Sequence, residues 1–213
     1  MGLLSAKSQR LPPCLAGFEA IQRFYDSDGV TVVARVLPGE FYVTTRDEMC
    51  ITTLGSCVSA CIRDPRTGVG GLNHFMLPLS DGSGIWMQDD PGAATRYGNF
   101  AMERLINELL KRGARRGDLD VKLAGGGRMY TSKADIGQRN IEFVRSYLAA
   151  EGLTISSEDL GDAQPRQIRY FPKTGRLQVR RLPTLEAQVL SAAEARYQAS
   201  LVEESATGDI ELF

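Results

Sequence analysis

The spacing of apolar and polar residues divides the chain into short strands and two long helices. Runs rich in β-branched and other apolar residues, bounded by turn residues, predict strands at 30–37, 40–45, 49–53, 58–62, 69–76, 119–124, 153–157, 167–171 and 176–182. Apolar residues at helical spacing predict helices at 95–112, through Phe100, Leu105 and Leu109, and at 140–151. Because strands and helices do not alternate in a regular βαβ period, the pattern favours an α+β layered fold over a doubly wound parallel sheet.

The two ends of the chain differ from this middle part. Residues 1–29 contain Pro12 and Pro13 and only a weak apolar pattern, which indicates a flexible leader with one helical turn near residues 19–25. Residues 184–203 are rich in Ala and Glu, and their apolar positions are sparse, so they predict an appended helix followed by an acidic tail. The expected organisation is therefore a leader at 1–29, one domain at 30–183 and a C-terminal helix and tail at 184–213.

Composition excludes several classes of function. Lys and Arg number 25 against 26 Asp and Glu, and no basic stripe is present, so no nucleic-acid partner is expected. No apolar run approaches the length of a membrane span, which argues against direct membrane insertion. The four cysteines are unevenly placed, which is not the pattern of a disulfide framework, and a cytoplasmic location is expected.

The candidate chemistry lies in residues 52–78, which contain Cys57 and the one histidine of the chain, His74. Asp64 and Pro65 are strong turn residues, so the strands on either side of them are expected to form a hairpin with Cys57 near His74. A histidine within hydrogen-bond reach can convert a thiol to a thiolate. Gly55 and Ser56, directly before Cys57, allow a sharp turn that can aim backbone N–H groups at one point, as an oxyanion hole requires.

Other interpretations of these residues are open. A free cysteine is usually a small buried apolar residue, and a lone histidine is more often structural than catalytic. A zinc site has the right ligand types in Cys50, Cys57, Cys61 and His74, but the ligand spacing is poor. The Gly125-Gly126-Gly127 run lacks the signature of a phosphate-binding loop and is interpreted as a backbone turn near the active site. Asn140 is interpreted as a structural tie between a helix and the sheet.

The same stretch resembles the chemoreceptor glutamine deamidases of bacterial chemotaxis, the CheD family. The resemblance rests on Gly55-Ser56-Cys57, an Asp64-Pro65 turn, Gly70-Gly71, and His74 followed by Phe-Met-Leu-Pro. It implies a layered sandwich of two mixed β-sheets with flanking helices, in an α/β/β/α-like order that is similar to cysteine-dependent deamidating toxins. It further implies a third catalytic residue, a threonine shortly upstream of the cysteine. Thr52 and Thr53 are both candidates, and Thr53 is chosen.

The activity that this resemblance implies is that of a protein-glutamine glutaminase, a hydrolase of the amidohydrolase type with a cysteine nucleophile. Its substrates would be specific glutamine side chains on methyl-accepting chemotaxis proteins, which become glutamates. Cys57, His74 and Thr53 would be catalytic, with Gly55 and Ser56 as oxyanion support, and neither a metal nor a cofactor is required. A CheC-type phosphatase is a further expected partner. The alternative is a non-catalytic chemotaxis adaptor that binds receptors or such a phosphatase.

Overall fold

The computed structural model describes residues 10–78, 92–129, 135–183, 190 and 192–201. The strands are β1 (Gln22–Tyr25), β2 (Val32–Arg35), β3 (Phe41–Thr44), β4 (Glu48–Leu54), β5 (Val58–Arg63), β6 (Gly70–Asn73), β7 (Asp120–Gly125), β8 (Ile155–Leu160), β9 (Arg166–Phe171) and β10 (Arg176–Arg181). The helices are α1 (Gly92–Lys111), the short 3-10 helix η1 (Arg116–Asp118) and α2 (Ile136–Ala150). The last described segment, residues 192–201, forms a further helix.

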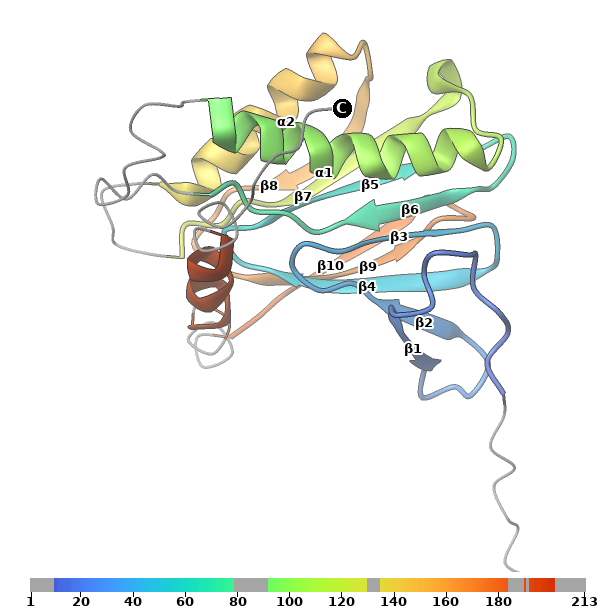
Figure 1. Ribbon diagram of the computed structural model, residues 1–213. Helices are drawn as coiled ribbons and strands as arrows, with labels where there is room; N and C mark the ends of the chain where they lie inside the picture. Colours follow the sequence, from blue (N-terminus) through green and yellow to red (C-terminus); the bar gives the residue numbers. More distant parts are fainter. Residues whose placement is uncertain (1–9, 79–91, 130–134, 184–189, 191, 202–213) are drawn as a thin grey trace, which may run out of the picture.

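The strands form two five-stranded sheets. The first sheet has the order β1-β2-β4-β9-β10, and the second has the order β3-β6-β5-β7-β8. Each sheet is mixed, because β2 and β4 are parallel in the first and β7 and β8 are parallel in the second. Both α1 and α2 lie over the outer face of the second sheet, so the layers run from helices to second sheet to first sheet (Figure 1). The predicted α+β fold with two mixed sheets is confirmed, although α1 and α2 form one helical layer instead of two.

Helix α1 packs on the second sheet through one apolar stripe. Met102, Leu105, Ile106 and Leu109 are buried, and their spacing of three and four residues places them on one face of the helix. The predicted stripe included Phe100, but this side chain is 57% exposed and lies beneath the guanidinium of Arg104, at 5.2 Å from the ring centroid. None of the helices in the described ranges is long and apolar enough to cross a membrane.

The hairpin of β5 and β6 fixes the positions of the candidate residues. Cys61 pairs with Leu72, and the same antiparallel register continues to a bridge between Val58 and Phe75. Side chains alternate between the two faces of a strand, so Cys57 and His74, each one residue before a bridge partner, point to the same face. The hairpin that the turn residues predicted is therefore confirmed.

The N-terminal boundary that the sequence predicted is wrong. Residues 22–25 are not a helical turn in a leader: they form β1, which pairs antiparallel with β2 at the edge of the first sheet. Phe18 is also buried, with its ring edge-on to Tyr42 at a centroid distance of 5.2 Å. The domain therefore begins well before residue 30, and the part of the predicted leader at 1–9 lies outside the described residues.

Helix α2 begins four residues earlier than predicted. Asp135 caps it, since its side chain accepts a hydrogen bond from the backbone N–H of Gln138 at 3.0 Å. Gly137 lies in the first turn, where a Cβ atom would come within 2.5 Å of the carbonyl oxygen of Gly126. A glycine at this position lets the helix start approach the turn after β7 closely, which matters for the site described below.

A test of the strand pairing uses Gly71, whose neighbour on β3 leaves no room for a side chain. A Cβ atom at Gly71 would lie 1.9 Å from the carbonyl oxygen of Tyr42, and a backbone atom in a ladder cannot move aside cheaply. We expect Gly71→Ala to lower the free energy of unfolding by about 2 kcal/mol or more, measured by urea denaturation. The control is Gly117→Ala, where nothing lies within 4 Å. Equal stability of the two variants would contradict this packing.

Candidate active site

Cys57 lies on the turn where the chain crosses from the first sheet to the second. Its three residues, Gly55-Ser56-Cys57, connect β4 to β5 and are buried. The backbone N–H of Gly127 donates to the carbonyl of Gly55 at 2.6 Å, and that of Gly126 donates to the carbonyl of Cys57 at 2.7 Å. The glycine turn after β7 therefore supports the cysteine turn, as the sequence predicted.

Asn140 ties this turn to the segment that follows His74. Its side-chain amide donates to the carbonyl of Ser56 at 2.8 Å, and its side-chain oxygen accepts from the backbone N–H of Leu77 at 2.9 Å. The side chain is fully buried, so both bonds are shielded from water. The predicted structural role of Asn140 is confirmed, and the early start of α2 is what brings this residue to the site.

A threonine holds the ring of His74. Thr52 Oγ1 lies 2.7 Å from His74 Nδ1 and 2.6 Å from the carbonyl oxygen of Val36. A carbonyl oxygen can only accept, so the single hydroxyl proton of Thr52 goes to Val36, and Nδ1 of His74 must donate to the threonine oxygen. The neutral imidazole therefore carries its proton on Nδ1 and presents a lone pair on Nε2. This is the tautomer that a general base needs.

The hydrogen bond to His74 comes from Thr52, whereas the sequence analysis chose Thr53. Neighbouring residues of β4 point to opposite faces of the first sheet, and Thr52 is the one that is buried toward His74. Thr53 is half-buried and pairs across the sheet with Gln167. We therefore replace Thr53 with Thr52 as the candidate third residue of the site.

Burial keeps the cysteine and the histidine uncharged in this conformation. The pKa of the Cys57 thiol is raised well above its ordinary value, first by burial and then by the negative charge and hydrogen bonding of Glu194. Burial lowers the pKa of His74 to about 4, which the charge of Glu194 only partly offsets. The resting pair is a neutral thiol and a neutral imidazole, not the thiolate that the sequence suggested. Within the described part of the chain, Nε2 of His74 is buried and has no hydrogen-bond partner.

Glu194 is the site residue that sequence reasoning missed. It belongs to the helix over residues 192–201, is 1% exposed, and its carboxylate accepts hydrogen bonds from all three residues of the cysteine turn. The helix therefore packs on the site and is not the loosely attached appendage that was predicted. A sparse apolar pattern contains no signal for a single buried carboxylate, so the sequence alone gave no means of finding this contact.

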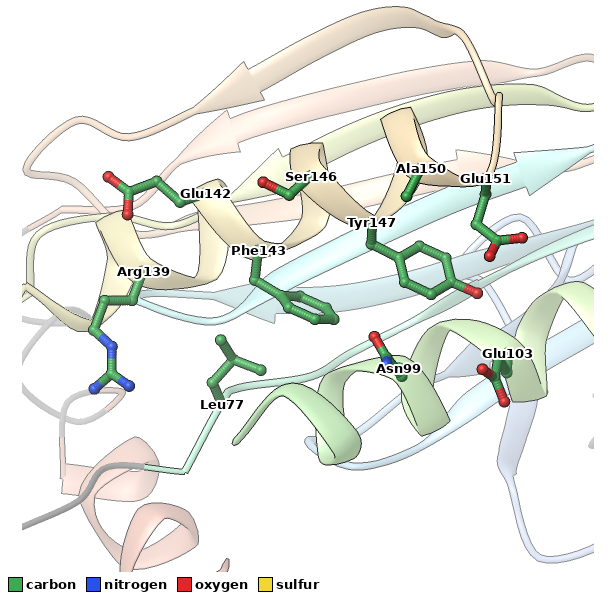
Figure 2. A pocket seen from close by; sticks show the side chains of 10 residues that line it. All are labelled: Leu77, Asn99, Glu103, Arg139, Glu142, Phe143, Ser146, Tyr147, Ala150 and Glu151. Atoms are coloured by element: carbon green, nitrogen blue, oxygen red, sulfur yellow. The ribbon is translucent and has the colours of Figure 1, made fainter. Parts of the chain in front are cut away.

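Two of the hollows that the described residues line bear on the site, and only one of these two reaches the candidate residues. A cavity of about 360 Å³ is lined by His74 together with Phe41, Tyr97 and Tyr197, among others. The larger one, about 560 Å³, is a groove between α1 and α2, where Phe143 and Tyr147 project from α2 above Asn99 and Glu103 of α1 (Figure 2). That groove contains neither Cys57 nor His74, so the smaller cavity is the one connected with the candidate chemistry.

The four residues considered as zinc ligands do not come together in the described part of the structure. Among the described residues, no group of three or more His, Cys, Asp or Glu side chains is placed to hold a metal ion. The four cysteines are free thiols, and Cys50 and Cys61 are buried in different sheets. High pKa values, raised by burial, keep the thiols of Cys50 and Cys61 protonated.

A buried cysteine on a turn with backbone N–H donors, and a histidine oriented by a third side chain, are features that cysteine-dependent hydrolases share. Residues 76–181 match the model of a family described as CheD chemotactic sensory transduction. The relatives include three proteins named "Probable chemoreceptor glutamine deamidase CheD". That of Halorhodospira halophila is 46% identical over 100% of this chain and 99% of its own length. That of Hydrogenovibrio crunogenus is 50% identical over 88% and 96%, and that of Saccharophagus degradans is 45% identical over 100% and 99%. The chain belongs to the CheD family.

Proposed function

We propose that this protein hydrolyses the side-chain amide of specific glutamines on methyl-accepting chemoreceptors, with Cys57 as nucleophile and His74 as general base and acid. The names of the curated relatives support the substrate class and the reaction. The roles are assigned from the hydrogen bonds that join Val36, Thr52 and His74. Because these bonds leave the proton on Nδ1 of His74, the lone pair of Nε2 points away from the threonine and is free to accept a proton. We propose Thr52 as the residue that positions His74.

The reaction begins with proton transfer and attack. His74 Nε2 takes the thiol proton as Sγ of Cys57 forms a bond to the amide carbon, and the carbonyl electron pair moves onto oxygen. The backbone N–H groups of Ser56 and Cys57 stabilise this oxyanion. When the carbonyl re-forms, the C–N bond breaks and the imidazolium proton leaves with ammonia. The product of this half-reaction is a thioester on Cys57.

The second half-reaction uses water. His74 removes a proton from a water molecule whose oxygen attacks the thioester carbon, and the C–S bond breaks as the carbonyl re-forms. Sγ recovers its proton from His74, and the glutamate carboxylate leaves. The net change is one amide and one water converted to one carboxylate and one ammonium ion. His74 transfers the thiol proton to ammonia and one proton of the water to Sγ, whereas the proton of the new carboxylic acid is lost to the solvent and ammonia takes up a proton there to become ammonium. Neither a metal nor a cofactor enters the scheme.

The proposed setting is the cytoplasm, where the signalling helices of chemoreceptors are exposed and where free cysteines persist in reduced form. A CheC-type phosphatase is proposed as a second partner. A purely non-catalytic adaptor would need neither the buried tautomer at His74 nor N–H donors around a cysteine, so the geometry favours the enzyme.

The experiment that tests the function is direct. The purified protein is incubated with a receptor cytoplasmic fragment, and glutamine-to-glutamate conversion is mapped by peptide mass spectrometry. We expect conversion at a few defined glutamines, and no conversion when the protein is omitted. Binding of the fragment without any conversion would favour the adaptor and refute the enzyme.

The role of Thr52 is tested with its neighbour as the matched control. Thr52→Val keeps the shape of the side chain but removes the hydrogen bond that fixes the tautomer of His74, so we expect kcat to fall about tenfold to a hundredfold. Thr53→Val, one residue away on the other face of β4, should retain most activity. Steady-state kinetics on the receptor fragment compares the two. A greater loss in Thr53→Val would restore Thr53 as the third residue.

A further inference from the structure

The carboxylate of Glu194 occupies the donor groups that the reaction needs. It accepts from the backbone N–H of Gly55 at 2.9 Å, of Ser56 at 3.0 Å and of Cys57 at 3.3 Å, and from the Ser56 hydroxyl at 2.7 Å. Glu194 is buried, so the donors of the cysteine turn hold its carboxylate away from water. These contacts are those expected of a ligand in a built site.

Glutamate is also the product of the proposed reaction. The carbonyl oxygen of a glutamine side chain could accept hydrogen bonds from the same N–H groups, with its amide carbon near Sγ of Cys57. Glu194 differs from such a substrate only by oxygen in place of the amide nitrogen. A Cβ atom at Gly55 would lie 2.8 Å from both carboxylate oxygens of Glu194. The glycine therefore leaves the room that the carboxylate, or a substrate amide in its place, occupies.

The rest of the helix fits the surface around the site. Glu194, Tyr197 and Leu201 follow one another at spacings of three and four residues, which places them on one face. Tyr197 donates to or accepts from the hydroxyl of Tyr97 in α1 at 2.5 Å, and both Tyr197 and Leu201 line the cavity next to His74. In Figure 1 this helix, coloured brown-red, stands at the end of the two sheets. Ala193 and Ala195 are exposed, so one helical face alone enters the site.

We propose that this surface, formed by the cysteine turn and the cavity next to His74, is the docking site for a substrate helix that presents a glutamine, and that the chain's own helix occupies it as a bound product. The inference rests on the proposed function and adds the form in which substrate is recognised. A receptor helix must then displace residues 192–201, and its apparent affinity is lowered by the fraction of molecules in which the site is covered.

The decisive variant turns the bound product back into a substrate. In the full-length chain, Glu194→Gln introduces an amide where the carboxylate now lies, and we expect the enzyme to hydrolyse it back to the acid during expression or incubation. Peptide mass spectrometry measures the conversion. The exposed Gln178 of β10 is the internal control and should keep its amide, and the double variant Cys57→Ala with Glu194→Gln should keep both amides.

The outcomes separate this inference from the proposed function. If the introduced amide persists in a protein that converts receptor glutamines, the helix does not occupy the substrate site and the inference is wrong while the function stands. If the amide is hydrolysed but no receptor glutamine is, the inference holds and the receptor assignment fails. If neither amide is converted, both are refuted.

A kinetic measurement tests the competition itself. Glu194→Ala removes the carboxylate that holds the helix, so we expect KM for the receptor fragment to fall about tenfold while kcat stays the same. Arg196→Ala, an exposed position on the same helix, is the control and should leave both constants unchanged. An unchanged KM in Glu194→Ala, or a loss of kcat, would overturn the competitive role.

Discussion

Replacing Cys57 with Ala is expected to lower the rate of glutamine deamidation by about ten-thousandfold or more, because no other group in the site can form the thioester. The side chain is fully buried, and the change removes one sulfur atom without adding bulk, so the fold should persist. The rate is measured by mass spectrometry on the receptor fragment, and circular dichroism checks the fold.

The matched control for this variant is Cys61→Ala. Cys61 lies on β5, the strand that follows the turn, and is equally buried, but it is four residues from Cys57. Both variants lose a similar apolar contact, so a similar small loss of stability is expected from each. Only Cys57→Ala should lose activity. Substantial turnover in Cys57→Ala would remove this residue from the mechanism.

The free energy of unfolding is expected to fall as the pH drops from 6.5 toward 4, because His74 is buried in its neutral form. Its pKa is lowered from 6.5 to about 4, so in this range the unfolded chain takes up a proton that the folded chain does not. The stability is fully present above pH 6.5 and is lost as the pH falls through the folded pKa. The whole effect is about 3 kcal/mol, of which about 2 kcal/mol is lost by pH 5.

The pH dependence can be assigned to one residue. The chain contains no other histidine, so the slope between pH 6.5 and 5 belongs to His74. Asp64, Asp120 and Asp159 have lowered pKa values and contribute mainly at lower pH. Urea denaturation at a series of pH values measures the slope, and His74→Gln should abolish it. A wild-type slope that survives in His74→Gln would show that another group is responsible.

The sequence predicted the parts of the site that local chemistry determines. The Asp64-Pro65 turn fixes the hairpin, and the hairpin register places Cys57 and His74 on one face. The long helix α1 was also predictable, because its apolar stripe has a clear period. These features depend on residues close to one another in the chain, so one sequence is enough to find them.

The features that the sequence missed depend on distant partners. Choosing between Thr52 and Thr53 requires knowing which face of β4 meets the second sheet, and β4 buries residues on both faces. Strand β1 is short and is defined by its pairing with β2. Glu194 lies 138 residues from Ser56, and its contact involves one carboxylate, which leaves no periodic pattern.

The crossing of the chain between its two sheets at Gly55-Ser56-Cys57 also makes the site depend on how the two sheets pack on each other. Thr52 belongs to the first sheet, whereas His74 follows the last residue of β6 in the second. The hydrogen bond between them therefore forms only when the sheets pack face to face. Any state of the chain in which the two sheets are not packed on each other therefore lacks the contact that orients the ring of His74.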